Sequence, residues 1–86
     1  MWKIVYSKQA VKDSNKTIES NLQNKVKHLI HILEDDPFQT QPPYEKLIGD
    51  LSGAYSRRIT LQHRLVYQVF LNEKIVRILR MWTHYD

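Results

Sequence analysis

Three apolar runs decide the fold, and they fill residues 54–83, whose sequence is AYSRRITLQHRLVYQVFLNEKIVRILRMWT. The runs cover residues 54–61, 64–71 and 74–83, and two residues separate each from the next. Each run is rich in β-branched and aromatic residues, which favour strands. Because connections this short join neighbouring antiparallel strands, residues 54–83 are predicted to form a three-stranded antiparallel meander.

The start of the chain predicts one strand and one helix. Residues 1–6 alternate and are rich in Trp, Ile, Val and Tyr, which indicates a short strand. Ser7 is a candidate N-cap for a helix that ends near Ser20 and Asn21. The weakly apolar face expected for this helix consists of Ala10, Val11, Ser14 and Ile18.

A second helix is indicated by apolar residues at the spacing i, i+4, i+7, i+8 and i+11. The helix is expected to end at Asp36, because the residue before Pro37 disfavours the helical conformation. Two antiparallel helices lying on a sheet would bury both apolar stripes. The stripe of the second helix consists of Leu22, Val26, Leu29, Ile30 and Leu33.

Residues 38–53 connect the second helix to the meander. Both glycines and two of the three prolines fall here, so a structured connection is predicted, with one helical turn near Glu45 to Ile48. The 86 residues are then a single domain, residues 1–86, of the α+β class. Its order is β-α-α-β-β-β, with two helices packed on one face of an antiparallel-rich sheet. The other face is left free for function.

Composition narrows the classes of function. The chain has no cysteine, which excludes disulfides, thiolate metal sites and cysteine nucleophiles. No apolar run reaches the roughly 18 residues of a spanning helix, and no signal peptide is recognisable, so we expect a cytoplasmic protein without a membrane partner. The formal net charge is +4, and the C-terminal part carries the excess. A basic surface favours nucleic acid, although an acidic protein partner also fits.

Arg58 and Arg64 are candidates for binding phosphate. Period-two alternation places both on the open side of the sheet, whereas Arg57 points the other way unless it reaches around an edge. Two guanidinium groups in one concavity would bind a phosphodiester and stabilise the negative charge of its transition state. Each arginine alone is more often a solvated strand residue, and only the whole set of residues favours phosphate.

Candidates for proton transfer come from the connection and from the C-terminus. Glu45 would act as a base on a ribose 2′-hydroxyl if its loop folds over the arginines, although alone it indicates only surface charge. His84, followed by Tyr85, suits proton transfer near neutral pH, but a terminal tail is often disordered. The spacings of the other histidines match no metal site, so no metal ion and no cofactor are expected.

Four blocks of sequence stand in a recognisable order: Tyr44-Glu45-Lys46-Leu47, LSGAYSRRI over residues 51–59, HRLVY over residues 63–67, and the terminal His84-Tyr85. Together they resemble the Txe/YoeB family of toxin endoribonucleases, which belongs to the RelE-like superfamily. The resemblance spans nearly the whole chain, and the blocks are specific only in combination. It implies a bacterial type II toxin that enters the ribosomal A site, cuts mRNA and is held inactive by a cognate antitoxin.

The resemblance also implies a role for each matching residue. The catalytic set would consist of Glu45 as general base, Arg64 as transition-state arginine, His84 as general acid and Tyr85 as an arranging residue. The sequence departs from the family pattern at Ile48, where some relatives carry a lysine. Lys46 could partly take the place of that lysine. The implied RNA-phosphate contacts are Arg58, Arg57 and Lys46.

Two other functions remain open. The main alternative is a catalytically inactive relative that keeps RNA or protein binding, and the complete acid-base set argues against it. A poison of DNA gyrase with a similar fold is the other, and the Glu45 loop and the terminal His-Tyr argue against that. The expected partners are the antitoxin, mRNA and the rRNA of the A site, with a homodimer and a heteromeric toxin-antitoxin complex both open.

Overall fold

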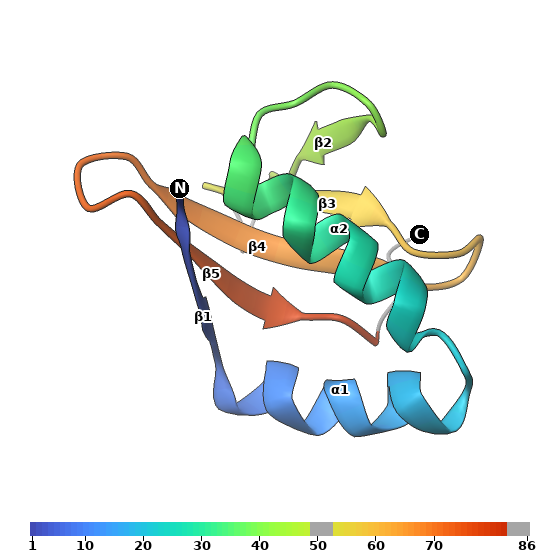
Figure 1. Ribbon diagram of the computed structural model, residues 1–86. Helices are drawn as coiled ribbons and strands as arrows, with labels where there is room; N and C mark the ends of the chain where they lie inside the picture. Colours follow the sequence, from blue (N-terminus) through green and yellow to red (C-terminus); the bar gives the residue numbers. More distant parts are fainter. Residues whose placement is uncertain (49–52, 83–86) are drawn as a thin grey trace.

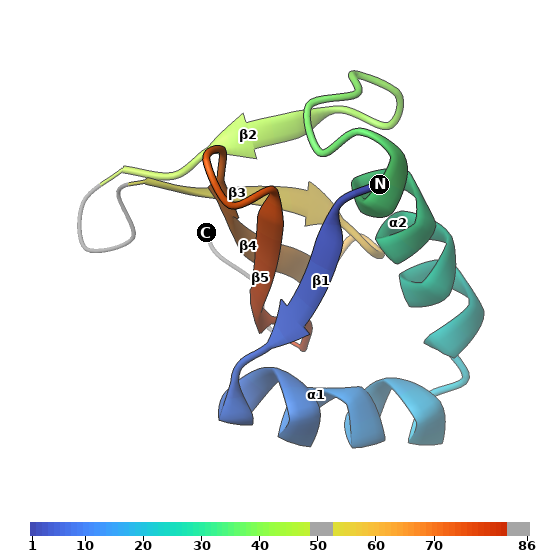
Figure 2. The same ribbon diagram turned by 60° about the vertical axis from the view of Figure 1, so that its left-hand side comes forward.

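Within residues 1–48 and 53–82, which the computed structural model describes, the chain forms two helices and five strands. The strands make one sheet in the order β1-β5-β4-β3-β2, and both helices pack on the same face of it (Figures 1 and 2). The predicted α+β fold is thereby confirmed. The elements are β1 (Lys3–Tyr6), α1 (Lys8–Glu19), α2 (Gln23–Asp35), β2 (Tyr44–Lys46), β3 (Ala54–Arg58), β4 (Arg64–Phe70) and β5 (Ile75–Arg80).

The last three strands form the predicted meander. β3 pairs antiparallel with β4, and β4 pairs antiparallel with β5, whereas β1 lies parallel to β5 at one edge of the sheet. β3 ends at Arg58, earlier than predicted. The reason is the side chain of Thr60, whose Oγ1 accepts the backbone N–H groups of Gln62 and His63 at 3.2 and 3.1 Å and so starts the turn early.

The sequence did not predict β2. Tyr44–Lys46 pair antiparallel with β3, so the helical turn expected near Glu45 to Ile48 is wrong. β3 would otherwise be an edge strand with unpaired backbone groups, and β2 satisfies them. Leu47 extends the pairing, because its N–H donates to the carbonyl of Ala54 at 2.9 Å.

Both helices lie where the sequence predicted them. The Oγ of Ser7 accepts the N–H of Ala10 at 3.0 Å and caps α1, which ends at the C-cap Ser20. α2 ends before Asp36, as expected from the following proline. The residues of its predicted stripe that are buried are Val26, Leu29 and Leu33.

α1 buries a different face from the one predicted. Val11 and Ile18 are each 54% exposed, whereas Asp13 and Thr17 are buried beside Ala10. The expected face was chosen from apolar spacing alone. A buried carboxylate that binds the end of β5 instead sets the rotation of this helix, since an unpaired buried charge would be costly.

The core lies between the helices and the side of the sheet that faces them. Leu65, Tyr67 and Ile78 are completely buried there. No helix in the described part of the chain is long and apolar enough to cross a membrane. Both helices of the described chain lie on that side, and neither covers the opposite face of the sheet (Figures 1 and 2). Ser56 and Val66 on this opposite face are nevertheless buried.

Candidate active site

Arg58 and Arg64 stand directly opposite each other at the adjoining ends of β3 and β4. Strand alternation puts both on the face without helices, as predicted. Like charges placed directly opposite each other on a sheet are destabilising. Among the described residues no carboxylate forms an ion pair with Arg58. An anionic ligand between the two guanidinium groups would relieve their repulsion.

Glu45 approaches the same place from β2. Its pairing with Ser56 puts it on the face that carries Arg58. Its Oε2 lies 3.5 Å from Nη1 of Arg64, and the Glu45 side chain is 66% exposed. Because this contact is long and open to solvent, the carboxylate remains accessible to a proton of a bound substrate. The three charged groups share a hollow of about 270 Å³, lined by Pro42, Pro43, Glu45, Ser56, Arg58 and Arg64.

Ser56 is a site residue that the sequence analysis missed. Its side chain is 1% exposed and lines the same hollow. Its Oγ has no hydrogen-bond partner among the residues that the structure describes. A buried hydroxyl is usually paired, so this oxygen is an exception among the described residues. The signal in the sequence was its place two residues before Arg58, on the same face of the strand.

Arg57 does not belong to this site, and the prediction that it binds RNA phosphate is wrong. Its side chain is 0% exposed, on the side of the sheet that faces the helices. Nε donates to the hydroxyl of Tyr67 at 3.0 Å, and Nη2 donates to the carbonyls of Pro37 and Gln39 at 3.0 and 2.7 Å. Nη1 donates to the carbonyl of Pro42. All three nitrogens are thus occupied by neutral protein groups.

Lys46 lies apart from the hollow. Alternation along β2 places it on the face opposite to Glu45. It is exposed, and it is not among the residues that line the hollow. The structure therefore brings Glu45, Arg58 and Arg64 together but not Lys46.

His84 and Tyr85 lie outside the described residues, which end at Trp82. The indole ring of Trp82 stacks on the imidazole of His63, with ring centroids 3.8 Å apart and an interplanar angle of 19°. His63 immediately precedes Arg64 in the sequence. The last described residue is therefore held against the turn that joins Arg58 to Arg64.

Asp13 holds the same end of the chain from α1. Its Oδ2 accepts hydrogen bonds from Nε of Arg80 at 3.0 Å and from the backbone N–H groups of Met81 and Trp82 at 3.1 and 3.3 Å. Burial acts to raise the pKa of Asp13. Hydrogen bonds from Gln9, Met81 and Arg80, together with the charge of Arg80, outweigh it, so the pKa lies below its ordinary value.

Asp13→Asn is expected to weaken the dependence of the free energy of unfolding on pH in the acid range. Since the folded-state pKa is lowered, ionised Asp13 stabilises the fold above its ordinary pKa of about 3.9, and this stability is lost as the pH falls through the folded-state value. In urea unfolding, wild type and Asp13→Asn should differ most above about pH 5 and converge in acid. Asp35→Asn, at an exposed carboxylate, is the matched control. A gap between wild type and Asp13→Asn that stays constant at every pH would contradict the role of the charge.

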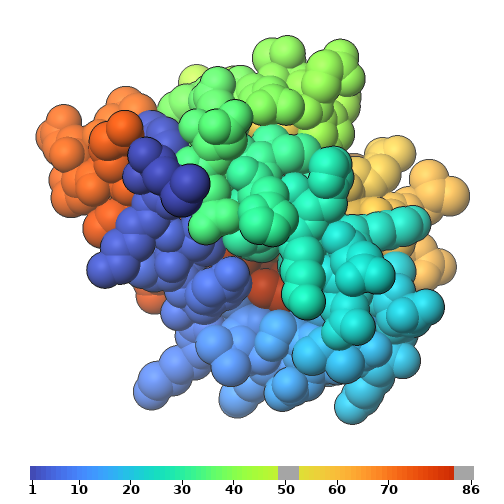
Figure 3. All heavy atoms as spheres, viewed as in Figure 1, coloured from blue at the N-terminus to red at the C-terminus, as the bar shows by residue number. Residues whose placement is uncertain are grey.

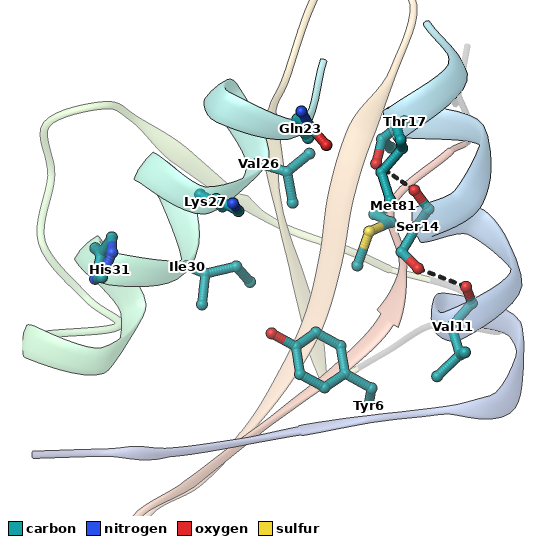
Figure 4. Close-up of a pocket in the computed structure, with 11 residues that line it drawn as sticks. Tyr6, Val11, Ser14, Thr17, Gln23, Val26, Lys27, Ile30, His31 and Met81 are labelled. Atoms are coloured by element: carbon teal, nitrogen blue, oxygen red, sulfur yellow. Dashed lines mark hydrogen bonds between the residues drawn. The ribbon is translucent and has the colours of Figure 1, made fainter. Parts of the chain in front are cut away.

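Another hollow lies between α1 and α2, on the helical side of the molecule (Figure 4). Figure 3 shows red atoms from the end of β5 at its bottom, between blue α1 and green α2. Among the described residues that line it, none is acidic and none is an arginine, so this hollow lacks the carboxylate and guanidinium groups that the hollow of Glu45 brings together. The volume is about 420 Å³, and the lining consists of Tyr6, Val11, Ser14, Thr17, Ile18, Gln23, Val26, Lys27, Ile30, His31 and Met81.

Within the described part of the chain, no group of three or more His, Asp or Glu side chains could hold a metal ion. His28 and His31 are both exposed on α2. Nδ1 of His31 lies 3.2 Å from Oε1 of Glu34, one turn further along the helix. Both helical histidines are therefore exposed to solvent.

The fold and the hollow together define a small α+β domain that presents two arginines and a carboxylate on the open face of its sheet. A family model described as the YoeB-like toxin of bacterial type II toxin-antitoxin systems matches residues 6–85. The chain belongs to this family and is the toxin of a type II toxin-antitoxin system. The resemblance drawn from the sequence is thereby confirmed.

Individual toxins named as YoeB are similar to this chain in sequence and in structure. A "Toxin YoeB" of Mycobacterium bovis is 41% identical over 61 residues, which are 71% of this chain and 69% of the relative. The YoeB/ParE toxin from Agrobacterium tumefaciens superposes with a TM-score of 0.86 at 29% identity, over 96% of this chain and 99% of that one. The toxin of a YoeB-YefM complex from Staphylococcus aureus superposes with a TM-score of 0.82 at 31% identity, over 99% of each chain.

Proposed function

We propose that this toxin is an endoribonuclease that cuts mRNA in the A site of translating ribosomes without using a metal ion. The observation that carries the proposal is the shared hollow of Glu45, Arg58 and Arg64. A carboxylate beside two guanidinium groups supplies a base and a cationic site for a phosphodiester. Its place of action is then the cytoplasm, where ribosomes translate.

The reaction begins with proton transfer to Glu45. Its carboxylate removes the proton of the ribose 2′-hydroxyl, and the 2′-oxygen attacks the adjacent phosphorus. Arg64 and Arg58 stabilise the additional negative charge on the phosphorane. The bond from phosphorus to the 5′-oxygen then breaks, and His84 gives that oxygen a proton. The products carry a 2′,3′-cyclic phosphate and a 5′-hydroxyl.

Tyr85 is assigned an arranging role beside His84. Both assignments rest on the family resemblance and on the anchored position of Trp82, two residues before His84. We further propose that a cognate antitoxin holds the toxin inactive. Structures from Staphylococcus aureus include a heterotetrameric YoeB-YefM complex and a YoeB dimer, and the toxins in both share this fold.

A single 2′-deoxyribose at the scissile position is expected to abolish cutting there, because the nucleophile is missing. The measurement is mapping of RNA ends after incubation with programmed ribosomes, using matched messages that differ in that one oxygen. A deoxyribose placed one nucleotide away is the control, and it should leave cleavage at the site intact. Cutting of the message that lacks the scissile 2′-oxygen would refute this route.

A binding module would behave differently in the same experiment. A catalytically inactive relative would bind programmed ribosomes without producing new RNA ends on any message. In that case Glu45→Gln would leave translation inhibition unchanged. Under the proposed mechanism, Glu45→Gln lowers the cleavage rate about 10²- to 10⁴-fold, the usual contribution of a positioned base.

A further inference from the structure

A third hollow, of about 450 Å³, adjoins the candidate active site. It lies between the start of α2 and the end of β3, since both contribute residues to its lining. We name it the α2 groove. It shares Pro42 and Arg58 with the hollow of Glu45 and Arg64, so the two hollows adjoin each other at Arg58. The α2 groove is lined by Asn24, Lys25, His28, Leu29, Pro42, Arg58 and Ile59.

The lining of the α2 groove suits a nucleotide. Its floor is apolar, because Leu29 and Ile59 are buried and Pro42 lies beside them. Such a floor can pack against a base or a ribose, while cations and hydrogen-bond donors at the rim bind phosphate. Among the described residues that line the groove, none is acidic. The exposed rim consists of Asn24, Lys25, His28 and Arg58.

The start of α2 adds positive potential to the same place. Its N-cap, Leu22, makes no side-chain hydrogen bond, and the first turn of the helix contains no acidic residue. The first backbone N–H groups of a helix lack intrahelical acceptors and carry partial positive charge. Lys25 in this turn adds a full charge, so the groove complements a phosphate.

We propose that the α2 groove binds the phosphate and nucleoside of the RNA nucleotide next to the scissile linkage. This inference rests on the proposed function and extends its site by one nucleotide. Arg58 stands between the scissile phosphate and the flanking one, and Lys25 neutralises the flanking phosphate. The groove thereby fixes the register of the strand, while Glu45 and Arg64 act on the reacting atoms.

Lys25→Glu tests the groove, and Lys12→Glu is the matched control. Lys12 is exposed on α1, lines no hollow described here, and gives the same change in net charge. In single-turnover cleavage on programmed ribosomes, Lys25→Glu should raise the half-saturating toxin concentration about tenfold. The maximal rate should stay within about twofold, because the contact is the same in the ground and transition states. Lys12→Glu should change neither quantity by that amount.

A neutral methylphosphonate identifies the phosphate that Lys25 contacts. It is placed at one linkage at a time on either side of the scissile one, on 2′-O-methyl sugars that keep it stable. At the contacted linkage it should weaken wild type several-fold, yet not weaken Lys25→Glu, since contacts that share a partner are not additive. Equal weakening of both proteins at every linkage would overturn the inference and indicate that the groove meets another part of the ribosome.

A binding measurement separates failure of this inference from failure of the proposed function. If wild type does not cut, the endoribonuclease assignment fails, and binding of a fluorescent five-nucleotide RNA to the isolated toxin then tests the groove. Lys25→Gln should lower the slope of log affinity against log salt by about one, as expected for the loss of one phosphate contact. An unchanged slope, or no binding by wild type, would overturn the inference.

Discussion

Arg57→Ala is expected to lower the free energy of unfolding by about 3–5 kcal/mol, because buried acceptors lose their donor and a large side chain is removed from the interior. This is a large share of the roughly 5–15 kcal/mol that holds a typical domain together. The variant leaves three backbone carbonyls and the Tyr67 hydroxyl without their donor. It also removes a guanidinium that lies 5.1 Å from the centre of the Tyr44 ring. Burial raises the pKa of Tyr67 to about 12, although the charge of Arg57 acts in the opposite direction, so the phenol accepts as a neutral group.

Urea unfolding of three variants measures this effect. Arg57→Lys keeps the charge but loses the planar fork that reaches all four acceptors, so it should lose more than half as much stability as Arg57→Ala. Arg58→Ala is the matched control, because Arg58 is exposed and should change stability by no more than about 0.5 kcal/mol. Similar losses for Arg57→Ala and Arg58→Ala would contradict the division of roles between the two arginines.

These neighbouring arginines show what the sequence could and could not predict about the site. Period-two alternation placed Arg58 and Arg64 on one face and Arg57 on the other, and the strand register confirms both assignments. Alternation could not show that the carbonyls of Pro37, Gln39 and Pro42 enclose the Arg57 side chain. That enclosure depends on the path of a connection far away in the sequence, and local patterns do not encode it.

The fold was predicted best where hydrophobic periodicity is strong. The meander and the stripe of α2 repeat regularly, and the order and pairing of the three strands and the buried side of α2 agree with the prediction. β3 and β5 are shorter than the predicted runs of residues 54–61 and 74–83. β2 has only three residues, too few for a period to be recognised, and its strand geometry arises from pairing with β3. The buried face of α1 was missed for a related reason, because the tertiary hydrogen bonds of Asp13 decided it.

The residues of the candidate site likewise fall into those that the sequence indicated and those that only the packing revealed. Glu45 entered the prediction through chemistry and family resemblance, and its proximity to Arg64 became clear only when β2 placed it on the open face. Ser56 has no motif of its own, and its buried, unpartnered Oγ is a property of packing among the described residues. The residues of the α2 groove come from a helix and a strand that are far apart in the sequence, so no spacing could connect them.

Arg64→Ala is expected to lower the single-turnover cleavage rate about 10²- to 10³-fold, the usual effect of removing one group that stabilises developing negative charge. Its only ion-pair contact in the described structure is the 3.5 Å approach to exposed Glu45, so loss of this ion pair should change the free energy of unfolding by less than about 1 kcal/mol. The rate should fall at saturating toxin. Arg64→Lys should recover part of it, because it keeps the charge but not the forked hydrogen bonds.

The kinetic pattern distinguishes this role from that of the α2 groove. Loss of an interaction made chiefly in the transition state lowers the maximal rate, whereas loss of uniform binding raises only the half-saturating concentration. Arg64→Ala should therefore show the first pattern and Lys25→Glu the second, measured on the same ribosomes and message. If Arg64→Ala raised the half-saturating concentration and left the maximal rate intact, Arg64 would be a binding residue. The charge of the phosphorane would then need Arg58 as its main partner in this hollow.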